Sequence, residues 1–183
     1  VLHQPQIAPN TGNIIRLCAN TGATLHLIKP LGFSISDKKV RRAGLDYYDI
    51  SSLILHESLE DFLRSASRKH IFAFSTQGQT NMFQANFVRN SFLIFGSETR
   101  GLPKSFLTDL NPSNSLRIPM VKTSRCLNLS NAVAVGVFEA WRQDEVRWLE
   151  SAGWERNPII RGKHPPDGGT ARPLGNRPKI DSR

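Results

Sequence analysis

The stretch Phe92 to Pro103 joins a short apolar run to a turn that carries one acid and one base. Its first four residues are apolar and few enough for a buried strand. Gly96 and Gly101 then frame the pair Glu98 and Arg100. Open α/β sheets bind ligands where loops leave the carboxyl ends of their strands. The pattern therefore predicts a ligand site at this loop, although a plain turn between a strand and a helix would have the same outline.

Several common site chemistries are absent from the sequence. The two glycines have the spacing that opens a phosphate-binding P-loop, but Leu102 and Pro103 stand where that loop needs Lys and Ser or Thr. The GxGxxG fingerprint of dinucleotide sites does not occur, and no GxSxG elbow surrounds a serine. The five histidines show no spacing typical of metal ligands. We therefore expect no metal site and none of the usual nucleotide cofactors of α/β proteins.

Two further polar stretches contain candidate residues. Residues 5–16 place two asparagines among prolines and a glycine, and they end on Arg16, early in an expected helix. Arginine is unfavourable near a helix N-terminus because of the helix dipole. Arg16 is therefore expected to meet an anion, the alternative being a surface residue without a role. Residues 118–131 form a polar loop between a strand and a helix, whose chemistry is ambiguous by itself.

The charge of the chain points to a polyanionic partner. The 183 residues carry a formal net charge of +9, which favours nucleic acid ahead of an anionic membrane surface. The turn from Lys38 to Arg42, followed by Tyr47 and Tyr48, suits phosphate contact and base stacking, although a solvated helix face would look alike. The two cysteines are far apart, and no apolar run is long enough for a membrane span. We expect a cytoplasmic protein.

Strands and helices are expected to alternate along the chain. Apolar runs predict strands at 1–2, 24–28, 71–74, 92–95 and 116–118. Helices are predicted after caps at Asn10 or Thr11, at Ser58, at Pro103, and at Asn128, Ser130 or Asn131, with Gly22 ending the first. Gly136 inside the last helix predicts a close helix or backbone neighbour. The alternation is typical of an α/β fold with a mostly parallel sheet flanked by helices.

The composition changes near residue 151. Residues 1–150 are expected to form one domain. Residues 151–183 hold five prolines, five glycines, seven Lys or Arg and three acids. Such a composition buries too little apolar surface to offset chain entropy, which predicts a flexible basic tail. The tail accounts for +4 of the +9 charge, so the domain itself is also basic.

These polar loops resemble, in order, the three sequence motifs of the SPOUT class of RNA methyltransferases. The resemblance is carried by PNTGNIIRLCANTG (9–22), DKKVRRAGLDY (37–47), FGSETRGLP (95–103), IPM (118–120) and RCLNLSNAVAVGVFEAWRQ (125–143). Within that class the chain is most similar to the small TrmL-like (YibK-like) enzymes that methylate the wobble nucleotide of tRNA. The resemblance covers about residues 1–143 and leaves out the tail.

The resemblance implies a fold, a reaction and partners. The fold is an α/β domain whose C-terminal part forms a deep trefoil knot. The reaction is transfer of a methyl group from S-adenosylmethionine, without a metal, to the ribose 2′-hydroxyl of tRNA nucleotide 34. The implied assembly is a homodimer formed through the C-terminal helix region. The alternatives are 2′-O-methylation of another tRNA or rRNA nucleotide and a non-catalytic RNA-binding module.

The resemblance also suggests roles for single residues. Arg16 is the candidate catalytic residue, supported by Asn10, Glu98 and Asn128, and we expect Glu98 to orient Arg16 or its own loop. The candidate cofactor-binding residues are Phe74, Gly96, Gly101, Ile118, Met120, Cys126, Leu127 and Ser130. The candidate RNA-binding residues are Lys39, Arg41, Arg42 and Arg125. Two positions depart from the family pattern, namely Cys126, where serine is usual, and Phe138, where tyrosine is common.

Overall fold

The computed structural model describes residues 1–35, 53–66, 70–121 and 124–151. Seven strands in these ranges form one sheet in the order β3-β2-β1-β6-β4-β7-β5. They are β1 (Leu2–His3), β2 (Leu25–Ile28), β3 (Leu53–His56), β4 (Ile71–Phe74), β5 (Thr80–Asn81), β6 (Phe92–Phe95) and β7 (Ser115–Arg117). Each pairing between neighbours is parallel, which confirms the predicted mostly parallel sheet.

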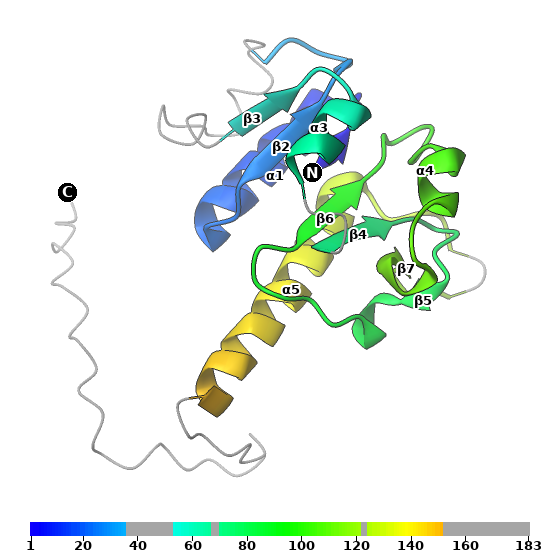
Figure 1. Cartoon of the computed structure of the whole chain (residues 1–183). Helices are drawn as coiled ribbons and strands as arrows, with labels where there is room; N and C mark the ends of the chain where they lie inside the picture. Colours follow the sequence, from blue (N-terminus) through cyan, green and yellow to red (C-terminus); the bar gives the residue numbers. More distant parts are fainter. Residues whose placement is uncertain (36–52, 67–69, 122–123, 152–183) are drawn as a thin grey trace, which may run out of the picture.

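Helices cover both faces of this sheet (Figure 1). Residues of α1 (Ala8–Thr21) and α5 (Leu129–Ser151) share one apolar cluster with the sheet, and residues of α3 (Leu59–Ser65) and α4 (Lys104–Thr108) share another. Strand β4 contributes Phe72 and Phe74 to the first cluster and Ile71 and Ala73 to the second. Its four residues are buried because a central parallel strand is covered on both sides. The predicted flanking helices are confirmed.

The ends of the helices follow local signals in some places and distant ones in others. Ser58 caps α3 by accepting a hydrogen bond from the Asp61 backbone N–H at 3.1 Å, as predicted. Gly22 ends α1 in the left-handed conformation at φ +70°, also as predicted. The predicted start of α1 is wrong, because the helix begins at Ala8 rather than after Asn10 or Thr11. Proline is tolerated in its first turn because the missing N–H would have no helical partner there.

Helix α5 packs very close to the sheet at Gly136. A Cβ atom there would lie 3.1 Å from ring carbons of both Phe74 and Phe95. These two rings are stacked, with centroids 4.5 Å apart. Gly136 thus has a close neighbour, but the prediction of a helix or backbone there is wrong, because the neighbour consists of two aromatic side chains. The contact brings α5 against the carboxyl ends of β4 and β6.

Several predictions differ from the structure or lie outside its described ranges. Strands β3 and β5 were not predicted, and β7 begins one residue earlier than expected. The basic turn 38–42 and the tail from 152 onward lie outside the described residues. The trefoil knot stays a prediction. No helix within the described ranges is both long enough and apolar enough to span a membrane.

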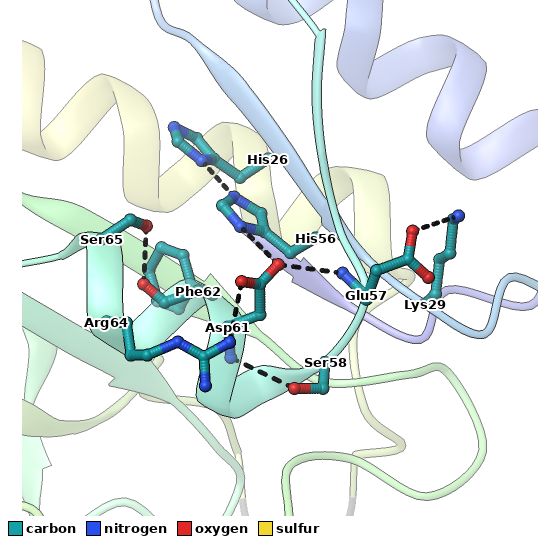
Figure 2. Close-up of polar contacts among 9 residues, drawn as sticks. All are labelled: His26, Lys29, His56, Glu57, Ser58, Asp61, Phe62, Arg64 and Ser65. Atoms are coloured by element: carbon teal, nitrogen blue, oxygen red, sulfur yellow. Dashed lines mark hydrogen bonds and ion pairs between the residues drawn. The ribbon is translucent and has the colours of Figure 1, made fainter.

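A pair of histidines joins β2 to β3 on the face that α3 covers (Figure 2). His26 Nδ1 and His56 Nε2 lie 2.9 Å apart, and the two rings are stacked with centroids separated by 5.2 Å. Phe62 packs edge-on against both rings. Asp61 Oδ2 lies 3.9 Å from His56 Nδ1. Burial, the amino group of Val1 and the neighbouring His56 together lower the pKa of His26 to about 4.

This lowered pKa makes the stability of the fold depend on pH. Between the ordinary histidine pKa of about 6.5 and the folded value of about 4, the unfolded chain binds a proton that folded His26 does not. The free energy of unfolding should therefore fall as the pH falls through this range. In His26→Asn the amide keeps a polar group beside His56 without titrating, so the variant should lose less stability on acidification than the wild type. Urea unfolding at pH 7 and pH 4.5 measures the difference, and equal losses would contradict the assignment.

Candidate functional site

A cavity of about 660 Å³ lies at the carboxyl ends of the adjacent strands β6, β4 and β7. Its walls come from residues 75–77 after β4, residues 96–102 after β6, and residues 118, 120 and 126–129 before and at the start of α5. Ile7 and Asn10, near the start of α1, also line the cavity. The volume is within the range of small-molecule sites. This is the sheet edge at which the sequence predicts a ligand site.

The loop after β6 folds back on itself through its two glycines. Ser97 and Gly101 form an antiparallel bridge, with the Gly101 N–H donating to the Ser97 carbonyl at 3.0 Å. A Cβ atom at Gly96 would overlap the backbone of Gly101. Gly101 itself has φ +68°, which favours glycine. The glycine pair is therefore required by the close turn, and this turn exposes backbone along the cavity.

Glu98, which projects from that turn, holds the start of α1. Its Oε2 accepts a hydrogen bond from the Gln6 backbone N–H at 2.8 Å. Its Oε1 accepts from the Ile7 backbone N–H at 3.2 Å and from Asn10 Nδ2 at 2.9 Å. The first N–H groups of a helix lack internal partners, and the helix dipole favours a negative charge beside them. The carboxylate thus stands where a local capping side chain was expected.

The polar contacts continue from α1 to α5. Asn128 Nδ2 donates to Asn10 Oδ1 at 3.0 Å. Asn128 Oδ1 accepts from the Ser130 backbone N–H at 2.9 Å and from the Ser130 hydroxyl at 2.7 Å. Asn128 is therefore the one of the three predicted caps whose side chain accepts a bond from the first turn of α5. Glu98, Asn10, Asn128 and Ser130 form one chain of hydrogen bonds, called here the Glu98 chain.

The structure brings most of the predicted site residues together. Among the candidate cofactor-binding residues, those that line the cavity are Phe74, Gly96, Gly101, Ile118, Met120, Cys126 and Leu127. Ser130 is outside the lining and contacts Asn128 instead. Asn10, Glu98 and Asn128 line the cavity, whereas Arg16 lies outside its lining, exposed on α1. The roles assigned to these residues stay predictions.

The predicted RNA-binding residues are placed only in part. Arg125 is exposed, next to Cys126 in the wall of the cavity. Lys39, Arg41 and Arg42 lie outside the described residues. The orientation of Arg16 by Glu98 also stays a prediction, since the hydrogen bonds of Glu98 go to residues 6, 7 and 10.

Some residues of the site were not predicted. Ser75, Thr76 and Gln77 line the cavity after β4, and Lys104 lines it after β6, beyond Arg100 of the predicted loop. Their signal in the sequence was their position directly after two buried strands, because parallel strands end at the same sheet edge. Across the described ranges, no group of three or more His, Cys, Asp or Glu side chains is placed to hold a metal ion.

Comparison with known proteins gives matches over most of the chain. The model of the SpoU rRNA Methylase family matches residues 1–138. The tRNA (cytidine(34)-2′-O)-methyltransferase of Escherichia coli strain K12 is 50% identical over 143 residues, which cover 78% of this chain and 91% of the relative. The enzyme of the same name from Aeromonas hydrophila is 51% identical over 143 residues, with coverage of 78% and 92%.

Solved structures agree with these matches. A structure described as giving insights into the 2-OH methylation of C/U34 on tRNA is 45% identical, with a TM-score of 0.72 and coverage of 78% of this chain and 92% of that one. The SpoU methyltransferase AviRb of Streptomyces viridochromogenes, in complex with the cofactor AdoMet, has a TM-score of 0.67. It is 23% identical and covers 78% of this chain and 56% of its own, a likeness in fold.

Replacing Glu98 should loosen the start of α1. Glu98→Ala removes both acceptor oxygens and should lower the free energy of unfolding by about 1–2 kcal/mol, the range of a lost helix cap. Thr99→Ala changes an exposed neighbour in the same turn and should stay within about 0.5 kcal/mol of the wild type. Urea unfolding of the three proteins checks this. Equal stability of Glu98→Ala and Thr99→Ala would show that the Glu98 contacts do not hold α1.

Proposed function

This chain belongs to the SpoU rRNA Methylase family, and from that premise we propose that it transfers a methyl group from S-adenosylmethionine to the ribose 2′-hydroxyl of nucleotide 34 in tRNA. The observation that carries the proposal is the 50% identity to a tRNA (cytidine(34)-2′-O)-methyltransferase across 91% of that relative. A match of this extent leaves little of the relative without a counterpart here. The neighbour described for methylation of C/U34 supports the same reaction.

The cavity suits S-adenosylmethionine by its size and by its lining. Phe74, Ile118 and Leu127 offer apolar surface to an adenine ring, and the turn from Gly96 to Gly101 lines the same cavity. The AdoMet complex of a protein with this fold supports the assignment. When bound, S-adenosylmethionine supplies a methyl group already activated by a sulfonium centre.

Arg16 is assigned to stabilise the negative charge that develops when the ribose 2′-hydroxyl attacks the methyl group. The 2′-oxygen forms a bond to the methyl carbon as the carbon–sulfur bond breaks, the sulfur keeps the bonding electron pair, and the hydroxyl proton passes to water. The protein must align the two groups and stabilise the developing negative charge on oxygen. Arginine side chains stay protonated in proteins, so Arg16 is expected to act as a cation that holds the target phosphate and favours the alkoxide, not as a base.

The Glu98 chain is assigned the positioning of α1 against the cavity. Glu98 and Asn128 both bind Asn10, so the loop after β6 and the start of α5 hold the same turn of α1. Arg16 follows Asn10 by six residues, about 9 Å along the helix axis. A shift of this turn would therefore carry Arg16 with it. In this proposal Asn10, Glu98 and Asn128 act on the reaction by holding α1 in place.

A specific observation favours a second candidate reaction. The name of the matching family contains rRNA, so 2′-O-methylation of a ribosomal nucleotide is the second candidate. The higher identity of the relatives named for tRNA nucleotide 34 favours tRNA. Offering both RNAs to the purified protein separates the two candidates.

Methyl transfer should occur on tRNA and depend on Arg16. The wild-type protein, given labelled S-adenosylmethionine and a tRNA transcript, should methylate nucleotide 34. Arg16→Ala should lower kcat by about 10²–10³-fold, the usual loss when a transition-state stabiliser is removed. Its affinity for S-adenosylmethionine, measured by isothermal titration, should stay near that of the wild type because Arg16 is outside the cavity lining.

The control is a tRNA with a single 2′-deoxy substitution at nucleotide 34, which should accept no methyl group. Transfer to that tRNA would overturn the proposed target. A substantially active Arg16→Ala would overturn the role of Arg16 and leave the target intact. Cofactor binding without transfer to any RNA would point to the non-catalytic module.

The proposal includes a homodimer formed through α5. Val135, Phe138 and Trp141 are spaced three residues apart on this helix, and 38%, 48% and 49% of their surfaces are exposed. Phe138 and Trp141 pack together with ring centroids 5.8 Å apart. Contiguous exposed apolar side chains of this kind mark interaction surfaces. A second copy of the chain, presenting the same stripe, is the proposed occupant.

A charge placed on this stripe should dissociate the dimer. Phe138→Glu should change the mass measured by light scattering from that of two chains to that of one, because the carboxylate would be buried at the interface. Arg64→Gln, an exposed change on α3, which covers the opposite face of the sheet from α5, should leave the mass unchanged. A wild-type mass of one chain, or a Phe138→Glu dimer, would overturn the proposed interface.

A further inference from the structure

Two cations line the cavity without an acidic partner. Arg100 lies in the turn after β6, and Lys104 is the first residue of α4. Both side chains belong to exposed residues, and no salt bridge joins either one to an acid within the described ranges. Their charge is therefore available to a ligand of the cavity.

The charges around the cavity leave this positive charge uncompensated. Glu98 is the acid that lines the cavity among the described residues, and its two oxygens are occupied by three donors near the start of α1. Arg125, exposed beside Cys126, adds a third cation from a different wall. The residues between these walls include the apolar Phe74, Ile118 and Leu127. The mouth of the cavity is thus positive and part of its lining is apolar.

We infer that Arg100 and Lys104 bind phosphodiester groups of the substrate RNA next to the target nucleotide. The inference rests on the proposed function. In RNA the 2′-hydroxyl and the 3′-phosphate are attached to neighbouring carbons of one ribose. A ribose that presents its 2′-hydroxyl to the cavity therefore brings phosphate to the rim. Arginine matches phosphate oxygens in a two-point geometry, and lysine binds them as a point charge.

The carboxylate of S-adenosylmethionine is the other anion that could reach these cations. That carboxylate stands beside an ammonium group, so the amino-acid end of the cofactor has no net charge. Successive phosphodiesters each carry a full negative charge, and a strand of them can engage two separate cations. The exposure of Arg100 and Lys104 also favours a ligand that approaches from solvent, as a strand of RNA does.

The salt dependence of RNA binding tests the inference. Fluorescence anisotropy of a labelled anticodon stem-loop would give Kd for the wild type, Arg100→Gln, Lys104→Gln and the double variant at a series of salt concentrations. Each lost phosphate contact should reduce the magnitude of the negative slope of log affinity against log salt by about 0.7, the value for single strands. The double variant should reduce that magnitude by about 1.4. KM for tRNA should rise while kcat at saturating tRNA is retained.

Arg89→Gln provides the matched control. Arg89 precedes β6, so it lies at the opposite edge of the sheet from the cavity, where its Nε is 3.9 Å from Asp144 Oδ2 and 85% of its side chain is exposed. Arg89→Gln removes the same charge as Arg100→Gln and should keep the wild-type slope. If Arg89→Gln changes the slope as much as Arg100→Gln does, the effect comes from the overall charge of the protein, and the inference is overturned.

Two further results would decide between the ligands and between the proposals. Wild-type slopes in the double variant, with weaker binding of S-adenosylmethionine in isothermal titration, would assign the cations to the cofactor carboxylate and overturn the inference. The wild-type protein could also fail to transfer a methyl group to nucleotide 34 while the double variant still has a smaller salt slope than the wild type. That result would support the phosphate contacts and contradict the proposed function. Both measurements use the full chain. Because Arg100 and Lys104 are exposed, their replacement by Gln is expected to leave the fold intact.

Discussion

The carboxylate of Glu98 is the interaction on which the cavity depends. It accepts hydrogen bonds from residues 6, 7 and 10, which precede it in the sequence by 92, 91 and 88 residues. Asn10 then binds Asn128, 118 residues further along the chain. Two walls of the cavity that no local signal joins, the loop after β6 and the segment before α5, are thereby held to Asn10 of α1. Because an ionised acceptor forms stronger hydrogen bonds than a neutral one, the Glu98 side chain can hold its own loop firmly against the start of α1.

These contacts are possible because of the order of the strands. β1, β6, β4 and β7 are neighbours in the sheet although they are far apart in the sequence, and each pairing is parallel. Their carboxyl ends therefore meet at one edge, where the loops that follow them can touch. Gly136 lets α5 approach the rings of Phe74 and Phe95 at this edge. The close packing of α5 brings its first turn within hydrogen-bonding distance of α1.

Local signals in the sequence were enough for the features that depend on neighbouring residues. The apolar runs 71–74 and 92–95, the cap at Ser58 and the left-handed Gly22 were predicted, and each depends on a few adjacent positions. The start of α1 could not be predicted in this way, because the carboxylate that binds the backbone N–H groups of Gln6 and Ile7, just before the helix, belongs to Glu98. The resemblance to a family placed most of the lining, since it carries information about contacts between distant loops. It did not indicate the polar residues 75–77 or Lys104 after β6.

The presence of an acid in a site proposed for RNA has a physical explanation in these contacts. A carboxylate near phosphates would raise the energy of the bound state by repulsion, and more strongly where water is excluded. Glu98 is compensated by the backbone N–H groups of Gln6 and Ile7, just before α1, and by the dipole of that helix. Arg100, two residues away in the same turn, has no acidic partner among the described residues and adds positive charge at the mouth. One short turn can therefore hold the site together through its acid and attract RNA through its base, because each charge has a different partner.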